Sequence, residues 1–130
     1  MASLLYPSAK TAILNAGINF SSDTFNVCLL GSGYSYSTAH AAYGDVSGSE
    51  ITGTGYTAGG AALTSQSVSN GVFTAANVSW TSSTITASYT AIYDTTASNA
   101  LVALIDFGGS QSDTAGTFQI QWNSSGILYL

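Results

Sequence analysis

The sequence predicts a mainly β protein, an antiparallel β-sandwich or barrel with one short helix near the N-terminus. Three observations lead to this prediction. Polar and apolar residues alternate over several runs in the second half of the chain, and glycine, serine and asparagine separate those runs at short intervals. Helical periodicity is confined to the start. At 130 residues the chain has the size of one domain, so we treat 1–130 as a single domain.

The N-terminal segment, residues 1–17, contains the expected helix. Pro7 suits a first helical position, and the apolar residues of LYPSAKTAILNAG fall on one helical face. Gly17 is a suitable stop signal. We therefore expect a helix over about residues 8–16, followed by a strand in DTFNVCLL, residues 23–30.

The middle of the chain is its least regular part. After the break at GSGYS we expect one helical turn over residues 38–43, with Ser37 or Thr38 as its cap. Residues 44–60, GDVSGSEITGTGYTAGG, are rich in glycine and have no sustained period. Long irregular segments of this kind are often functional loops, and we expect a glycine-rich loop here.

Strand signals fill residues 61–130. LTSQSVS alternates, and Asn70 with Gly71 forms a strong hairpin signal that leads into GVFTAANVSWT. STITASYTAIYD also alternates, with threonine and serine on one face. ALVALIDFG, residues 100–108, is nearly all apolar and predicts a central strand covered on both faces. QSDTAG indicates a loop, and TFQIQWN and ILYL indicate the last two strands.

Charged residues are unusually few, at 5% of the chain against about 25% in an ordinary soluble domain. The chain has six acids, one lysine and no arginine, which gives a net charge of −5. Because neutralising phosphates requires several lysines or arginines, we expect no nucleic-acid partner. No apolar run reaches the roughly 18 residues of a membrane span, and the start lacks the basic region of a signal peptide, so we expect no membrane partner.

A surface poor in lysine and glutamate suits burial against other proteins. Burying it immobilises few long side chains, and interfaces are depleted in these residues and enriched in tyrosine. The composition therefore favours a protein that functions inside an assembly; a secreted or adhesin-like β domain is the alternative. The single cysteine, Cys28, lies in the apolar run FNVCLL, which predicts a buried free thiol.

The stretch YSYSTAHAAYGD holds the only histidine, His40, five residues before Asp45. The residue types permit a Ser-His-Asp arrangement. However, the chain has no G-x-S-x-G elbow, and residues five apart do not share a helical face well. We therefore expect no enzymatic activity, and a histidine that hydrogen-bonds backbone or tyrosine. A pH-sensitive or interfacial histidine is the remaining alternative.

Metal and cofactor sites are not expected. One histidine and one cysteine cannot build a zinc site within one chain, and DVSGSE, residues 45–50, lacks the spacing of a calcium loop. Ligands gathered from several chains of an oligomer stay open. Asp94 and Asp106 end adjacent expected strands and would suit glycoside hydrolysis if they met across a cleft. Acids at strand ends usually mark turns, and we expect this role for them and for Asp113.

Contact residues are expected among the loop tyrosines and at both ends of the chain. Tyrosines on loops stack on sugars or anchor protein partners, with core packing as the alternative for about half of them. Exposed apolar ends are hard to explain in a monomer, although the C-terminal set has the alternative of docking on its own core. The expected contact residues are Leu4, Leu5, Tyr6, Tyr34, Tyr36, His40, Tyr43, Tyr56, Leu128, Tyr129 and Leu130.

Several short motifs follow one another along the chain: YP before the helix, GINFSSDTFNVCLL, YSYSTAH, GVFTAANVSW, ALVALIDFGG and TFQIQWNSSGILYL. In this order, over nearly the whole chain, they resemble a family of small β-rich structural proteins of tailed bacteriophages. Members often carry a proline-containing loop before the last strands, whereas FGGSQSDTAG has no proline.

The resemblance implies a virion component without enzymatic activity that is assembled in the host bacterial cytoplasm. Within virions it implies a capsid decoration or cement protein on the capsid surface. Its partners would be the major capsid protein or other virion proteins, with a homo-oligomer expected and a trimer favoured. A tail, head–tail adaptor or fibre-associated protein is the first alternative, and a carbohydrate-binding β module is the second.

Overall fold

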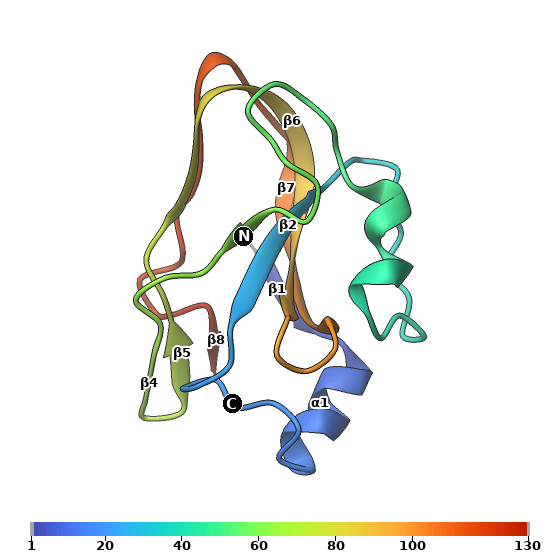
Figure 1. Ribbon diagram of the computed structural model, residues 1–130, viewed down its shortest axis with the longest axis vertical. Helices are drawn as coiled ribbons and strands as arrows, with labels where there is room; N and C mark the ends of the chain where they lie inside the picture. Colours follow the sequence, from blue (N-terminus) through green and yellow to red (C-terminus); the bar gives the residue numbers. More distant parts are fainter. Residues whose placement is uncertain (1, 130) are drawn as a thin grey trace.

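The computed structural model describes residues 2–129, in which one helix accompanies eight β-strands (Figure 1). In chain order the elements are β1 (Ala2–Leu5), α1 (Pro7–Leu14), β2 (Phe25–Leu30), the 3-10 turns η1 (Tyr43–Asp45) and η2 (Ser47–Ser49), β3 (Ala61–Ala62), β4 (Ser67–Ser69), β5 (Val72–Thr74), β6 (Val78–Asp94), β7 (Ala100–Ile120) and β8 (Leu128–Tyr129). The predicted class, mainly β with antiparallel sheets and a short N-terminal helix, is confirmed. No helix in the described part of the chain is long and apolar enough to cross a membrane.

Two antiparallel sheets form the molecule. The larger has the strand order β1-β7-β6-β2-β3, and the smaller has the order β4-β5-β8. In Figure 1 the larger sheet stands in the middle, the smaller sheet lies on one side of it, and η1 and η2 lie on the other. The two faces of the larger sheet therefore have different neighbours.

A bulge divides the β6–β7 pair into two parts. The pairing jumps from Tyr89–Asp106 to Ala87–Gln111, so β7 carries extra residues between these two pairs. Gly108 and Gly109, which lie in this bulge, have φ angles of 81° and 148°, which only glycine adopts at little cost. On one side of the bulge the strands belong to the larger sheet. On the other side they form a ribbon that arches away from it (Figure 1).

The expected loop at QSDTAG is therefore wrong, because these residues continue β7. Asp113 is likewise not a turn residue. Its carboxylate accepts hydrogen bonds from the Ser83 hydroxyl at 2.6 Å and from the Ile85 amide at 2.8 Å, where the β6–β7 register shifts. Glycine and serine at a bulge give the same local signal as a turn, and only the pairing with β6 distinguishes the two.

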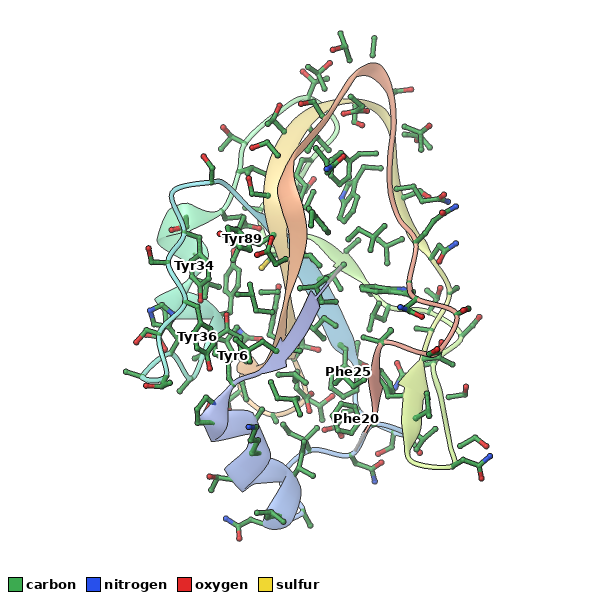
Figure 2. All side chains as sticks on the ribbon, turned by 180° about the vertical axis from the view of Figure 1, so that it is seen from behind. Tyr6, Phe20, Phe25, Tyr34, Tyr36 and Tyr89 are labelled. Atoms are coloured by element: carbon green, nitrogen blue, oxygen red, sulfur yellow. The ribbon has the colours of Figure 1, made fainter. Side chains whose placement is uncertain are left out.

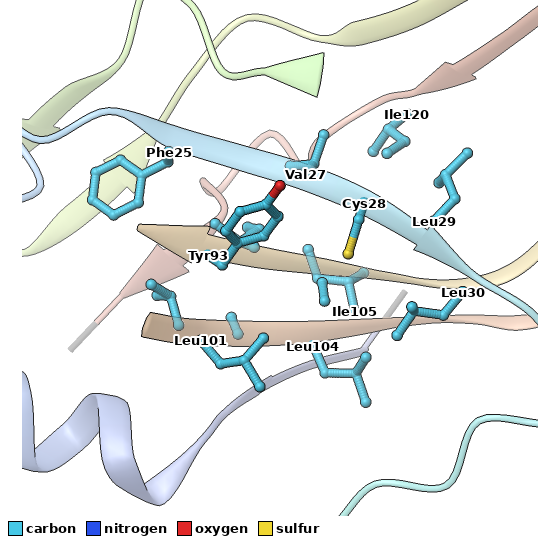
Figure 3. Close-up of a cluster of buried hydrophobic side chains, with 14 of the residues drawn as sticks. Phe25, Val27, Cys28, Leu29, Leu30, Tyr93, Leu101, Leu104, Ile105 and Ile120 are labelled. Atoms are coloured by element: carbon cyan, nitrogen blue, oxygen red, sulfur yellow. The ribbon is translucent and has the colours of Figure 1, made fainter. Parts of the chain in front are cut away.

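The core confirms the burial predicted for the central strands (Figure 3). Residues 101–105 of β7 are all buried, as expected for a strand covered on both faces. In β6 buried and exposed residues alternate over 78–81 and again over 82–87, with the phase shifted where the β6–β7 register shifts, and residues 88–94 are mostly buried on both faces. Cys28 is a buried free thiol as predicted, and burial raises its pKa to about 12.

Other predictions were partly wrong. The helix starts at Pro7 but ends at Leu14, two residues before the expected end. The turn expected over residues 38–43 does not form a helix; a 3-10 turn forms at Tyr43–Asp45 instead. LTSQSVS contributes only its last three residues to a strand. The hairpin at Asn70–Gly71 is confirmed, with φ angles of 52° and 76° that suit a type I′ turn.

Candidate functional site

The face of the larger sheet that looks toward η1 gathers tyrosines from three parts of the chain (Figure 2). Sheet register places Leu4 of β1 opposite Leu104 of β7, and Tyr89 of β6 opposite Asp106 of β7. Leu104 and Asp106 are two residues apart on one strand, so all four side chains share this face. The loop after β2 adds further tyrosines over it.

A chain of hydrogen bonds fixes that loop on the sheet. The hydroxyls of Tyr6 and Tyr34 are 2.7 Å apart, and the Tyr34 hydroxyl is 2.9 Å from Nδ1 of His40. Both tyrosines are buried, and burial raises the pKa of Tyr6 far above its ordinary value, so these hydrogen bonds join neutral hydroxyls. The prediction that His40 bonds a tyrosine is confirmed.

Asp45 does not complete an acid–base pair with His40. Its Oδ2 accepts hydrogen bonds from the amides of Ala41 at 2.8 Å and Ala42 at 3.0 Å, and the residue is exposed. These two bonds lower the pKa of Asp45, and the proximity of His40 contributes less. Asp45 therefore anchors the turn that carries His40, and within the described residues no hydrogen bond joins the two side chains.

A groove opens beside the loop and has a volume of about 500 Å³. Its lining residues are Leu4, Tyr34, Ser35, Tyr36, Tyr89, Leu104 and Asp106, and we call it the tyrosine groove. Tyr34 packs edge-to-face on Tyr89, with ring centroids 5.7 Å apart, while Tyr36 packs on Tyr6 at 5.3 Å. Tyr36 and Tyr89 are only half-buried, so aromatic surface remains open to a ligand.

The other two loop tyrosines serve a different group, the carboxylate of Glu50. Tyr43 and Tyr56 each donate a hydrogen bond to it, and the Gly59 amide donates a third at 2.8 Å. Burial, and after it Glu50, raise the pKa of both tyrosines. The Tyr56 hydroxyl also accepts the Leu29 amide at 3.0 Å. Tyr43 and Tyr56, expected as contact residues, thus hold the glycine-rich loop 44–60 against β2.

An acid pair lies where β2 begins and β6 ends. Asp94 is fully buried; its Oδ1 accepts the amides of Thr96 and Ala97, and its Oδ2 has no hydrogen-bond partner. Burial, together with the neighbouring Asp23 carboxyl, raises the pKa of Asp94 to about 7. Burial and the nearby Asp23 carboxyl both favour the protonated form of Asp94.

Asp94 and Asp106 do not form such a pair. Asp106 lies opposite Tyr89, whereas Asp94 lies opposite Ala100 at the end of the hairpin. Both accept amides of the residues that follow them, as expected for acids that mark turns. The sequence offered no signal for Asp23, because its place beside Asp94 depends on the β2–β6 register. In the described part of the chain no cluster of three or more histidine, cysteine or acidic side chains could hold a metal ion.

The opposite face of the larger sheet carries an apolar pocket of about 90 Å³ near α1. Its lining residues are Leu5, Ile13, Phe20, Val68, Gly71, Phe73 and Leu128, and we call it the apolar pocket. Phe20 packs on Phe73 at 4.8 Å and stacks on Phe25 at 5.3 Å. Val68, which lines the pocket, is 47% exposed, and Leu14, next to Ile13 of its wall, is 86% exposed.

The residues expected at the two ends of the chain separate into exposed and buried ones. Leu4 is exposed and Leu5 is half-buried, whereas Tyr6 and Leu128 are buried in the chain's own core. Tyr129 pairs with Val72 through β8, and Leu130 lies outside the described residues. Leu4 and Leu5 are consecutive in a strand, so they point to opposite faces: one into the tyrosine groove, the other into the apolar pocket.

No family model, curated protein or solved structure matches the chain. The tyrosine groove and the apolar pocket are two candidate sites. The larger sheet separates them, so a ligand in one does not obstruct the other.

Proposed function

We propose that the chain is a non-enzymatic structural subunit of a tailed-bacteriophage virion. Within the virion we assign it to the capsid surface, as a decoration or cement protein that binds the major capsid protein and associates with copies of itself, with a trimer favoured. The sequence resemblance points to the virion. The observation that carries an assembly role is the exposed apolar rim of the apolar pocket on a surface with very few charges.

Val68 in the pocket lining and Leu14, the neighbour of Ile13 on α1, are side chains that gain from burial. Leu14 and Val68 are 86% and 47% exposed. Full burial of a leucine or valine side chain stabilises a contact by about 1.5–3 kcal/mol, so even partial burial of both is a useful contribution. The pocket is apolar and open enough to take one aliphatic side chain from a partner. Because a symmetric assembly repeats each contact, modest contacts add up to stable attachment.

The proposal shifts the expected contact region by a few residues. Tyr6 and Leu128 are used in the core, and Leu14 with Val68 take their place at the surface. The region still combines the N-terminal segment with the β4–β5–β8 sheet, so both ends of the chain contribute to it. Few lysines and acids need to be desolvated there, which favours a close apolar contact.

A comparison of two variants tests the assembly role. We expect the double variant Leu14→Ser, Val68→Ser to lower the oligomer mass in light scattering and native mass spectrometry while the melting temperature changes little. Leu4→Ser, the same kind of change on the other face of the larger sheet, is the matched control and should leave the mass unchanged. A strictly monomeric wild-type chain at about millimolar concentration, or an effect of Leu4→Ser alone, would contradict this interface.

Copy number in purified virions tests the location. On the order of hundreds of copies per particle fits capsid decoration, and about a dozen or fewer fits a neck or tail component. Quantitative mass spectrometry of particles from a phage that encodes the chain measures this number. Absence of the chain from particles would refute the virion role itself.

A further inference from the structure

We propose that the tyrosine groove binds a neutral saccharide. This function is additional to assembly and uses the opposite face of the larger sheet. The groove volume of about 500 Å³ lies within the roughly 300–1,000 Å³ typical of small-ligand sites. Its position on β1, β6, β7 and the loop after β2 gives it a rigid floor and one loop wall.

Aromatic surface is the first property that suits a sugar. Tyr36 and Tyr89 are half-buried, so each ring has one part packed and another part open to the groove. The C–H faces of a pyranose ring pack on such surfaces, and tyrosine adds a polar hydroxyl at the edge of the ring. Leu4 and Leu104 extend the apolar floor.

Unused polar atoms are the second property. The hydroxyls of Ser35, Tyr36 and Tyr89 form no hydrogen bond with any described residue. Asp106 uses Oδ1 to accept the Gly108 amide at 2.8 Å, and its Oδ2 accepts no hydrogen bond from any described residue. Donors and acceptors of this kind match the hydroxyl groups of a sugar, which both donate and accept.

The charge of the groove selects a neutral ligand. Among the described residues of its lining, Asp106 is the only charged one, and the chain carries a net charge of −5. The single lysine, Lys10, lies on α1 and does not line the groove. Uronates, sialylated glycans and phosphorylated ligands would meet like charge, and no cationic side chain among the described lining residues would compensate it.

Binding without hydrolysis follows from the same lining. Glycoside hydrolysis uses two carboxyl groups about 5–9.5 Å apart across the scissile bond, and the groove lining contains one. The groove is therefore suited to hold a saccharide unchanged.

The hydrogen bonds that join Tyr6, Tyr34 and His40 also contribute to saccharide binding. Tyr34 forms a wall of the groove, and its hydroxyl is held between Tyr6 and His40. A wall fixed before the ligand arrives loses little conformational freedom on binding. Tyr6, Tyr34 and His40 are therefore positioning residues for the saccharide, with Tyr34 also in contact with it.

Direct binding to defined oligosaccharides tests the proposal on the full chain. The probes are maltohexaose, cellohexaose and N-acetylchitohexaose, with hexagalacturonate as the anionic comparison and hexalysine as a cationic peptide. Backbone amide shifts in ¹H–¹⁵N spectra locate binding. We expect saturable shifts at residues 34–36, 89 and 104–106 with at least one neutral probe, and none with hexagalacturonate.

Two variants separate stacking from hydrogen bonding. Tyr36→Ala should weaken binding of the neutral probe by about tenfold or more, and Tyr36→Phe should weaken it less. Asp106 is exposed, so Asp106→Asn tests the groove without disturbing the fold. We expect a loss of about tenfold for it as well, while Thr81→Ala, an exposed change outside the groove, has no effect.

Several results would overturn the proposal. They are no binding of any neutral probe at millimolar concentration, binding of hexagalacturonate as tightly as the neutral probes, or unchanged affinity in Tyr36→Ala. Shifts caused by hexalysine alone would assign the groove to a protein partner instead. Because the assembly test uses Leu14 and Val68 on the opposite face, either proposal can fail while the other stands.

Discussion

The buried acid pair Asp23–Asp94 predicts that the chain loses stability as the pH rises from 4 to 7. Burial and the neighbouring carboxyl raise the pKa of Asp94 from 3.8 to about 7. The folded chain therefore holds this proton more tightly than the unfolded chain does. The resulting stabilisation is fully present below about pH 3.8 and disappears as the pH passes through about 7.

The magnitude follows from the pKa values. At 1.36 kcal/mol per pH unit, the change from 3.8 to about 7 corresponds to at most about 4 kcal/mol of unfolding free energy. Entry of water beside the ionised pair would reduce this value. Asp45 acts in the opposite direction: its lowered pKa gives stability that is lost only below its ordinary value of 3.8. The interval from pH 4 to 7 therefore isolates Asp94 from Asp45.

Asp94→Asn is the decisive perturbation. Its side-chain oxygen can keep accepting the amides of Thr96 and Ala97, and its NH₂ group can donate to the Asp23 carboxylate. We expect the variant to be more stable than the wild type at pH 8, by about 1–3 kcal/mol, and nearly independent of pH between 4.5 and 8. The exposed Asp106→Asn removes the same charge and should keep the wild-type slope.

Urea unfolding followed by tryptophan fluorescence measures these free energies. Trp80 is buried and Trp122 half-buried, so their environment changes on unfolding. A wild-type stability that stays constant or increases from pH 4.5 to 8 would refute the raised pKa of Asp94. A slope that persists in Asp94→Asn would assign the pH dependence to another group.

Three further perturbations have defined outcomes. Gly60→Ala should lower the free energy of unfolding by about 3 kcal/mol or more in thermal unfolding. The added carbon would lie 1.7 Å from the Val27 carbonyl oxygen, and Gly60 has a φ of +81°. Gly48→Ala is the control and should be nearly neutral, because its added carbon meets nothing within 4 Å. Glu50→Ala should lower the free energy of unfolding by about 2–4 kcal/mol, since two tyrosine hydroxyls lose their acceptor. It should also speed amide hydrogen exchange across residues 44–60. Unchanged exchange would contradict the anchoring role of Glu50. Assembly should change little between 0.1 and 1 M NaCl, and release of the subunit by 1 M NaCl would show that charge, not apolar burial, holds it.

Local patterns predicted the elements whose signals lie within a few residues. Period-two alternation marked β6, the apolar run marked the buried part of β7, and Asn70–Gly71 marked the β4–β5 hairpin. Pro7 marked the start of α1. In each case the residue type acts through its own φ or through burial on one face, so no knowledge of distant partners is needed.

Long-range register decided what the sequence could not predict. β1 is a strand only because ASLL pairs with residues 103–106 of β7, and QSDTAG is a strand only because it pairs with β6. The tyrosines obey the same rule. Tyr89 joins the groove because register places it opposite Asp106, while Tyr56 is withdrawn from the surface by Glu50. Composition identified tyrosines as the residues of interest. It could not show which of them line the groove and which of them bind Glu50.

The scarcity of cations explains how the acids are used. The six acids of the chain are Asp23, Asp45, Glu50, Asp94, Asp106 and Asp113. Each of them accepts a hydrogen bond from a backbone amide: that of Asn19, Ala41, Gly59, Thr96, Gly108 and Ile85 respectively.

With one lysine and no arginine, salt bridges cannot neutralise these acids, and hydrogen bonds from backbone amides and hydroxyls stabilise them instead. An acid bonded to a nearby amide fixes a turn, a bulge or a loop anchor, and it needs no partner charge on the surface. Because charged residues are so few, the rest of the polar surface consists mainly of serine, threonine and tyrosine. Such a surface has few charges to desolvate against a capsid or a sugar, so the local role of the acids and the binding roles proposed here have one physical origin.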